Sequence, residues 1–170
     1  MTRITAPVEG PTELDQVWGK RRAYYEIFMQ DYNASVGRVD PVLLELCRIR
    51  IAELVESGFD LSLRYQPARE AGVTEEKIGA VARYPESALF SDRERAALEF
   101  TEQFVIQSSA IFDQDVARVQ AHLNAEEFIY LTKALGVMDQ FARANSAFRI
   151  APTASAPSTM PAFAARPATA

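Results

Sequence analysis

The chain has 170 residues, of which 48% are hydrophobic and 24% charged, and this fits one globular domain with a substantial core. Its formal net charge of -5 disfavours nucleic acid and anionic membranes as partners. No apolar run approaches the roughly 20 residues that cross a bilayer, and the N-terminus lacks the apolar core of a secretory signal. We therefore expect a cytoplasmic protein.

Helical periodicity dominates the first part of the chain. Apolar and aromatic residues recur at helical spacing from about Thr12 to Ser35. Asp40 then offers an N-cap, followed by Pro41 at the first helical position. Beyond it, one buried helical face is predicted from Leu44, Cys47, Ile51, Leu54, Gly58, Leu61, Tyr65 and Ala68.

The segment 41–70 is compatible with one helix or with two. Gly58 in a helix interior costs about 1 kcal/mol relative to alanine. Ser57 and Asp60 resemble a capping box with Asp in place of Glu or Gln. We favour a break near 55–57 and a second helix that runs to about Ala71 and ends at Gly72.

Capping residues indicate the later helices. These are expected over about 75–83 after Thr74, to about Gln107 after Ser91, over 114–122 after Asp113, and to about Arg149 after Asn124. No stretch alternates with a period of two for long enough to predict a strand. The pattern therefore predicts an all-α domain over 1–150, followed by a flexible tail over 151–170 that is rich in Ala, Pro, Ser and Thr.

The helical hairpin from Glu45 to Arg64 is the most informative part of the sequence. With the segments Ala71–Ile78, Phe90–Leu98 and Leu131–Arg149, it resembles the carboxymuconolactone decarboxylase and alkylhydroperoxidase D-like family over about residues 35–150. The resemblance implies a helical bundle of about six or seven helices. It also implies a homo-oligomer, either a trimer or a hexamer, with pockets near the subunit interfaces.

That family has two chemistries. One branch reduces peroxides with a Cys-x-x-Cys pair, assisted by a preceding Glu and a following His. The other decarboxylates a muconolactone acid and has a His at the same position. Here Ser57 and Asp60 stand at the cysteine positions, Arg64 at the histidine position and Glu45 at the glutamate position. The resemblance therefore implies the scaffold without its thiol chemistry.

The polar residues of the hairpin are the candidate site. On one helix Ser57, Asp60 and Arg64 would lie within about 60° of one another, with Glu53 beside them if the helix is continuous. Arg64 is the candidate anchor for a substrate carboxylate or enolate, and Asp60 or Glu45 is the candidate general base. We thus predict Glu45, Asp60 and Arg64 as catalytic residues and Ser57, Glu53 and Arg64 as substrate-binding residues.

A purely structural interpretation of these residues competes with the catalytic one. Ser57 and Asp60 would then only cap a helix, Arg64 would pair with Asp60 or Glu53 at the surface, and Glu45 would favour a helix start.

The other reactive residue types are isolated. Cys47, the only cysteine, lies on the predicted apolar face and is expected to pack as a small hydrophobe. His122, the only histidine, provides no metal site by itself and is expected near the end of a short helix. No phosphate loop, metal-ligand cluster or nucleophile triad is present, so we expect neither a cofactor nor a metal.

The leading hypothesis is a cofactor-free, non-redox enzyme of the lyase, decarboxylase or isomerase type that acts on a small carboxylate or lactone. One alternative is a non-catalytic binding or assembly protein on the same fold. A second is residual alkylhydroperoxidase or peroxiredoxin-type activity.

Overall fold

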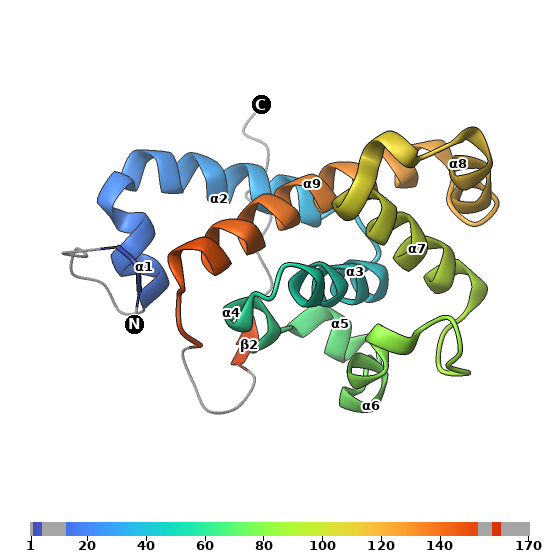
Figure 1. The fold of residues 1–170 in the computed structure, drawn as a ribbon, viewed down its shortest axis with the longest axis horizontal. Helices are drawn as coiled ribbons and strands as arrows, with labels where there is room; N and C mark the ends of the chain where they lie inside the picture. Colours follow the sequence, from blue (N-terminus) through green and yellow to red (C-terminus); the bar gives the residue numbers. More distant parts are fainter. Residues whose placement is uncertain (1, 5–12, 153–157, 161–170) are drawn as a thin grey trace.

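The computed structural model describes residues 2–4, 13–152 and 158–160, and these form a bundle of helices (Figure 1). The α-helices are α1 (Glu13–Trp18), α2 (Arg22–Val36), α3 (Pro41–Leu54), α4 (Gly58–Leu61), α5 (Gln66–Glu70), α6 (Glu75–Gly79), α7 (Asp92–Gln107), α8 (Asp113–Gln120) and α9 (Ala125–Phe148). Short 3-10 helices lie at Gly19–Arg21, Val81–Arg83 and Ser108–Ala110, and two short strands are β1 (Leu63–Tyr65) and β2 (Ser158–Met160). The all-α class is confirmed. The helices exceed the expected six or seven because several predicted segments are divided.

Helix α3 is the centre of the bundle (Figure 1). It packs against α7 and α9, and α2 packs against the outer side of α9. Every residue from Leu43 to Ile49 is buried, including the charged residues Glu45 and Arg48. The sequence predicted one buried face, whereas neighbours enclose this part of α3 on all sides.

The aromatic residues of the N-terminal segment pack mainly inside the chain. The Trp18 ring lies 5.4 Å from the Phe28 ring and 5.7 Å from the Phe141 ring, measured between centroids. Phe28 and Tyr32 are buried, but Tyr24 is exposed. The predicted single helix over 12–35 is divided after Trp18 by the 3-10 helix, and Thr12 lies outside the described residues.

Local capping signals are confirmed at most of the predicted positions. Asp40 accepts hydrogen bonds from the first N–H groups of α3, and Thr74 caps α6. Ser91 with Glu94 forms a capping box at α7, as does Asn124 with Glu127 at α9. The N-cap of α8 is Phe112 instead of Asp113.

The carboxylate of Asp115 explains the shifted cap of α8. It accepts the Phe112 N–H at 2.9 Å, so α8 begins one residue earlier than expected. The predicted helix over 75–83 is also divided, into α6 and the 3-10 helix Val81–Arg83.

The break predicted near 55–57 is confirmed. Helix α3 ends at Leu54, and Ser57 caps α4. Between them Glu56 has a φ of 53°, a left-handed conformation that reverses the chain. As a result the polar Ser57 and Asp60 are buried while Gly58 is exposed. The helical periodicity had instead placed Gly58 on the buried face.

The second helix of the hairpin does not run to Ala71 as expected. It stops at Leu61, and the chain becomes extended in β1 before α5 begins. Pro67 has no N–H to donate to the Leu63 carbonyl, as a continuous helix would require. The main-chain groups of Asp60, Leu63 and Tyr65 are bound by side chains of α3. They are therefore not used for helical hydrogen bonds.

Strand β1 pairs in parallel with β2, with Leu63 opposite Ser158 and Tyr65 opposite Met160. The expectation that the chain contains no strand is therefore wrong. The strands are three residues long, too short for a periodicity signal. The rest of the expected tail, 153–157 and 161–170, lies outside the described residues.

Candidate buried acid-base site

Helix α3 places a charged pair in the core. Glu45 and Arg48 are one helical turn apart, and their side chains are 1% and 5% exposed. Arg48 Nε donates to Glu45 Oε2 at 2.7 Å, and Arg48 Nη2 donates to Glu45 Oε1 at 2.9 Å. Burial opposes the charge on Arg48, but the adjacent Glu45 outweighs it and keeps the pKa of Arg48 above its ordinary value. The two form a bidentate ion pair with no net charge.

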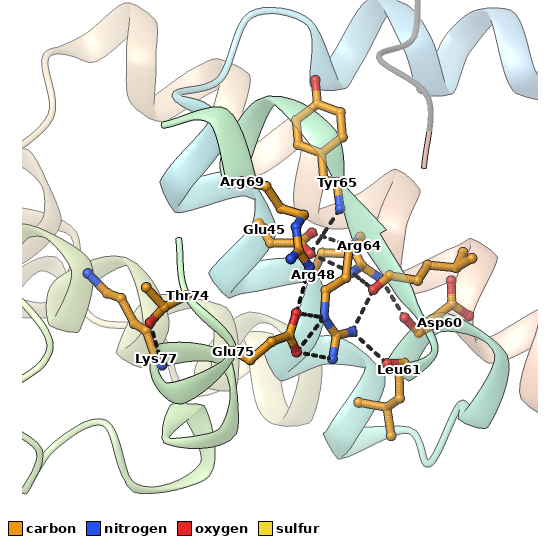
Figure 2. Close-up of polar contacts among 11 residues, drawn as sticks. Glu45, Arg48, Asp60, Leu61, Arg64, Tyr65, Arg69, Thr74, Glu75 and Lys77 are labelled. Atoms are coloured by element: carbon orange, nitrogen blue, oxygen red, sulfur yellow. Dashed lines mark hydrogen bonds and ion pairs between the residues drawn. The ribbon is translucent and has the colours of Figure 1, made fainter. Parts of the chain in front are cut away.

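This pair also binds the main chain of the hairpin (Figure 2). Arg48 Nη1 donates to the Asp60 carbonyl at 2.6 Å, and Arg48 Nη2 donates to the Leu63 carbonyl at 2.9 Å. The Tyr65 N–H donates to Glu45 Oε1 at 3.1 Å. One buried ion pair thus fixes the path of the chain from α4 through β1.

Asp60 is a second buried carboxylate beside this pair, in the first turn of α4. The Ser57 hydroxyl donates to Asp60 Oδ2, and Asn145 Nδ2 of α9 donates to the same oxygen at 3.1 Å. The Trp18 indole N–H donates to Asn145 Oδ1 at 3.1 Å. Because an indole N–H can only donate, it fixes the orientation of the Asn145 amide.

The electrostatic setting of Asp60 differs from that of Glu45. Burial raises the pKa of Asp60 above its ordinary value, while hydrogen bonds from Ser57 and Asn145 and the charge of Arg48 act in the opposite direction. Arg48 reaches Asp60 only through the main-chain carbonyl and is neutralised by Glu45. Asp60 is therefore a buried acid that has no cation of its own.

Tyr32 of α2 lies in the same environment. Its phenol interacts electrostatically with Arg48, Asp60 and Glu45, and burial raises its pKa. Tyr32 is 4% exposed, so it closes this polar region on the α2 side.

Arg64 does not lie on one helix with Ser57 and Asp60, as the sequence analysis assumed. It lies on β1, and its guanidinium pairs with Glu75 of α6 at 2.9 Å. The expected pairing with Asp60 or Glu53 is wrong because the helix ends at Leu61, before the turn that would align these side chains.

Glu53 also lies apart from this site. It pairs with Arg50 at 2.8 Å, and Arg50 in turn pairs with Glu102 of α7 at 2.6 Å. The structure therefore brings Glu45, Ser57 and Asp60 together and leaves Glu53 in a different network.

Cys47 and His122 remain separate from these residues. Cys47 is buried against the Ala97 carbonyl of α7, and burial raises the pKa of its thiol to about 12. His122 is exposed just after α8. Two open surface hollows of about 450 and 470 Å³ have neither Glu45 nor Asp60 in their lining; Tyr84 and Glu102 line the first, and Phe112 lines the second.

Sequence reasoning missed Arg48 and Asn145. The signal for Arg48 was available, because a cation one turn after Glu45 in an otherwise apolar helix needs a buried partner. Asn145 gave no comparable signal, since it is separated from Asp60 by 85 positions.

Among the described residues, no group of three or more His, Cys, Asp or Glu side chains is placed to hold a metal ion. No described helix is both long and apolar enough to span a bilayer.

The fold and the hairpin site define an all-α protein with an alkylhydroperoxidase D-like scaffold that lacks the thiol pair. The family model described as "Carboxymuconolactone decarboxylase family" matches residues 22–103. Over this segment the chain is similar to this family.

Two relatives are similar in sequence, and both are described as uncharacterized. YnjA of Escherichia coli strain K12 is 34% identical over 112 residues, which are 66% of this chain and 62% of that protein. YdfG of Bacillus subtilis strain 168 is 26% identical over 138 residues, 75% of this chain and 93% of that protein. The matched part thus spans less than two thirds of the first relative.

Two solved structures have the same fold. One is a protein of unknown function from Agrobacterium tumefaciens, described as a candidate antioxidant defence protein AhpD. It has a TM-score of 0.74 and 20% identity, covering 91% of this chain and 100% of that one. The other is an uncharacterized peroxidase-related protein from Silicibacter sp. TM1040, with a TM-score of 0.74 and 15% identity, covering 90% and 92%. At these identities the likeness shows the fold alone.

Proposed function

We propose that the protein is a cofactor-free, non-redox enzyme of the lyase, decarboxylase or isomerase type, acting on a small carboxylate or lactone with Asp60 as its acid-base group. The observation that carries this proposal is a buried carboxyl group whose nearest cation is already neutralised. Arg48 is paired with Glu45 through two hydrogen bonds. An ionised Asp60 is therefore a buried negative charge without a counter-ion of its own. Such a carboxyl group keeps its proton to higher pH and can exchange it with a substrate.

The hydrogen bonds around Asp60 indicate which of its oxygens carries the proton. Both side-chain donors, Ser57 and Asn145, reach Oδ2. The proton of the neutral acid therefore belongs on Oδ1, and this oxygen would give a proton to a substrate carbon or take one from it.

In this proposal Glu45 is a positioning residue and not the general base. Its carboxylate is occupied by Arg48 and by the Tyr65 N–H. It neutralises Arg48 and fixes the main chain next to Asp60. After CO₂ leaves a carboxylated substrate, protonated Asp60 would protonate the resulting carbanion and then recover a proton from water.

The test is turnover by purified wild-type protein and by the variants Asp60→Asn and Cys47→Ser. Carboxymuconolactone and simple β-keto acids serve as probes, with CO₂ release as the readout for decarboxylation. Lactone acids are followed by deuterium incorporation from D₂O. We expect Asp60→Asn to lose at least 100-fold in kcat, which is an ordinary share for a general acid or base, and Cys47→Ser to keep wild-type activity. Full activity of Asp60→Asn, or no reaction with any probe, would reject the assignment.

A second candidate function is supported by a different observation. Glu45 and Arg48 hold main-chain groups of Asp60, Leu63 and Tyr65 in place, as expected if the network stabilises the fold. The protein would then be a binding or assembly module. Thermal stabilisation by small carboxylates without turnover would favour this function.

Residual peroxidase activity has the weakest support. The single thiol of Cys47 is buried and its pKa is raised to about 12, whereas peroxide reduction requires an accessible thiolate. Thiol-dependent peroxide consumption that disappears in Cys47→Ser would favour peroxidase activity over the two functions described above.

We also propose that the chain forms a homo-oligomer in the cytoplasm, a trimer or a hexamer as the family resemblance implies. The exposed side chains of Tyr24, Ile27 and Ile129 on α2 and α9 support it, because exposed apolar groups favour association. Light scattering that shows only monomer at micromolar concentration would contradict it.

A further inference from the structure

The main chain holds the Arg64 guanidinium in one orientation. Arg64 Nη1 donates to the Leu61 carbonyl at 2.8 Å and to the Leu63 carbonyl at 2.7 Å. The side chain is 9% exposed. The turn between α4 and β1 therefore orients this group whether or not Glu75 is bound to it.

The opposite edge of the guanidinium binds a carboxylate (Figure 2). Arg64 Nε lies 3.0 and 3.1 Å from the two carboxylate oxygens of Glu75, and Arg64 Nη2 lies 2.9 Å from Oε2. Arg69 Nη1 donates to Oε1 at 2.7 Å. Two arginines thus converge on one carboxylate in the geometry that guanidinium groups use for carboxylate recognition. We call this pair of arginines the Arg64 carboxylate site.

The carboxylate that occupies this site is held less firmly than the arginine that binds it. The Glu75 side chain is 49% exposed and that of Arg69 is 45% exposed. Glu75 begins a helix of five residues, α6. Hydrogen bonds from Arg64 and the charges of Arg64 and Arg69 lower the pKa of Glu75, so it is ionised in the site. Because about half of the Glu75 side chain faces solvent, a competing carboxylate can reach the edge of the guanidinium that Glu75 occupies.

One main-chain oxygen connects this site to the buried acids. The Leu63 carbonyl accepts from Arg64 Nη1 at 2.7 Å and from Arg48 Nη2 at 2.9 Å. The guanidinium groups of Arg48 and Arg64 therefore meet at a single atom. A carboxylate bound by Arg64 would therefore be connected to the Glu45–Arg48 pair through the Arg64 guanidinium and the Leu63 carbonyl.

We infer that the Arg64 carboxylate site binds the carboxylate of a small organic acid, and that Glu75 is an internal carboxylate which blocks the site until the acid displaces it. That this acid is the substrate rests on the function proposed above; the binding itself does not.

The test uses Glu75→Gln and the matched control Glu76→Gln. The two variants remove the same charge from adjacent exposed positions, but only Glu75 contacts Arg64. Levulinate is the probe and levulinamide its uncharged analogue, with Kd measured by calorimetry at fixed ionic strength. We expect Glu75→Gln to bind levulinate at least tenfold more tightly than wild type and Glu76→Gln, with no such gain for levulinamide. Equal levulinate affinity in the three proteins, or an equal gain for levulinamide, would overturn the inference.

A second variant tests Arg64 directly. In the Glu75→Gln background, Arg64→Lys keeps the positive charge but loses the bidentate geometry, and circular dichroism checks that it is folded. The tenfold gain should then disappear, and its persistence would also overturn the inference. Tight levulinate binding in a protein that turns over no probe would reject the proposed function and keep the site. Turnover of a probe together with unchanged levulinate binding in Glu75→Gln would reject the site and keep the proposed function.

Discussion

Replacing Glu45 by glutamine isolates the contribution of the buried ion pair. The substitution keeps the side-chain length and one oxygen for the Tyr65 N–H, but it leaves the charge of Arg48 buried without a counter-ion. Breaking a buried pair by removing one partner costs about 3–5 kcal/mol, and Glu45 and Arg48 are 1% and 5% exposed. The loss would be a large part of the roughly 5–15 kcal/mol by which domains are stable.

The control is Glu53→Gln, which removes the same charge from the same helix. Arg50 keeps its second partner, Glu102, and the side chains of Glu53 and Arg50 are 25% and 17% exposed. We expect a loss of about 0–1 kcal/mol for this variant. Urea unfolding at one protein concentration, followed by far-ultraviolet circular dichroism, gives both values. A loss for Glu45→Gln no larger than that for Glu53→Gln would refute the assignment of a buried, structure-determining pair.

The same substitution has an electrostatic consequence for Asp60. With Glu45 neutral, Arg48 becomes the nearest uncompensated cation, and a nearby positive charge lowers the pKa of a carboxyl group. The carboxyl carbon resonance of Asp60 should titrate at lower pH in Glu45→Gln than in wild type. An unchanged titration would show that Glu45 does not control the charge that acts on Asp60.

Three further predictions concern single side chains. Burial raises the pKa of Asp60 above the unfolded value of 3.8, so the unfolded chain releases this proton first as pH rises. The wild-type free energy of unfolding should therefore fall relative to that of Asp60→Asn from about pH 4 up to the folded pKa, by about 1.4 kcal/mol for each pH unit. Parallel pH profiles of the two proteins in urea unfolding would contradict this. Trp18→Phe keeps an aromatic ring but removes the donor to Asn145, so we expect a loss of about 1 kcal/mol in urea unfolding, and a wild-type midpoint would show that this hydrogen bond is not needed. Cys47 should be inert to a thiol-specific reagent in the native protein at pH 8 and react once per chain in denaturant, and fast labelling of native protein would show that the thiol is accessible.

Several features of the fold are determined by short stretches of sequence. Asp40, Thr74, Ser91 and Asn124 were recognised as helix caps because a cap binds N–H groups two or three residues further along the chain. The break before Ser57 was predicted for the same reason. The absence of a thiol pair is likewise fixed by residue identity alone, because the sequence contains one cysteine.

The tertiary structure decided where the hairpin helix ends and which side chains form the site. Helix α4 stops at Leu61 because Arg48 and Glu45 bind main-chain groups that a longer helix would use. Asp60 is completed by Asn145, and Arg64 finds Glu75 rather than an acid of its own segment. Local propensity describes only neighbours along the chain, whereas a buried charge takes whichever partner the packing of distant helices brings within hydrogen-bond distance.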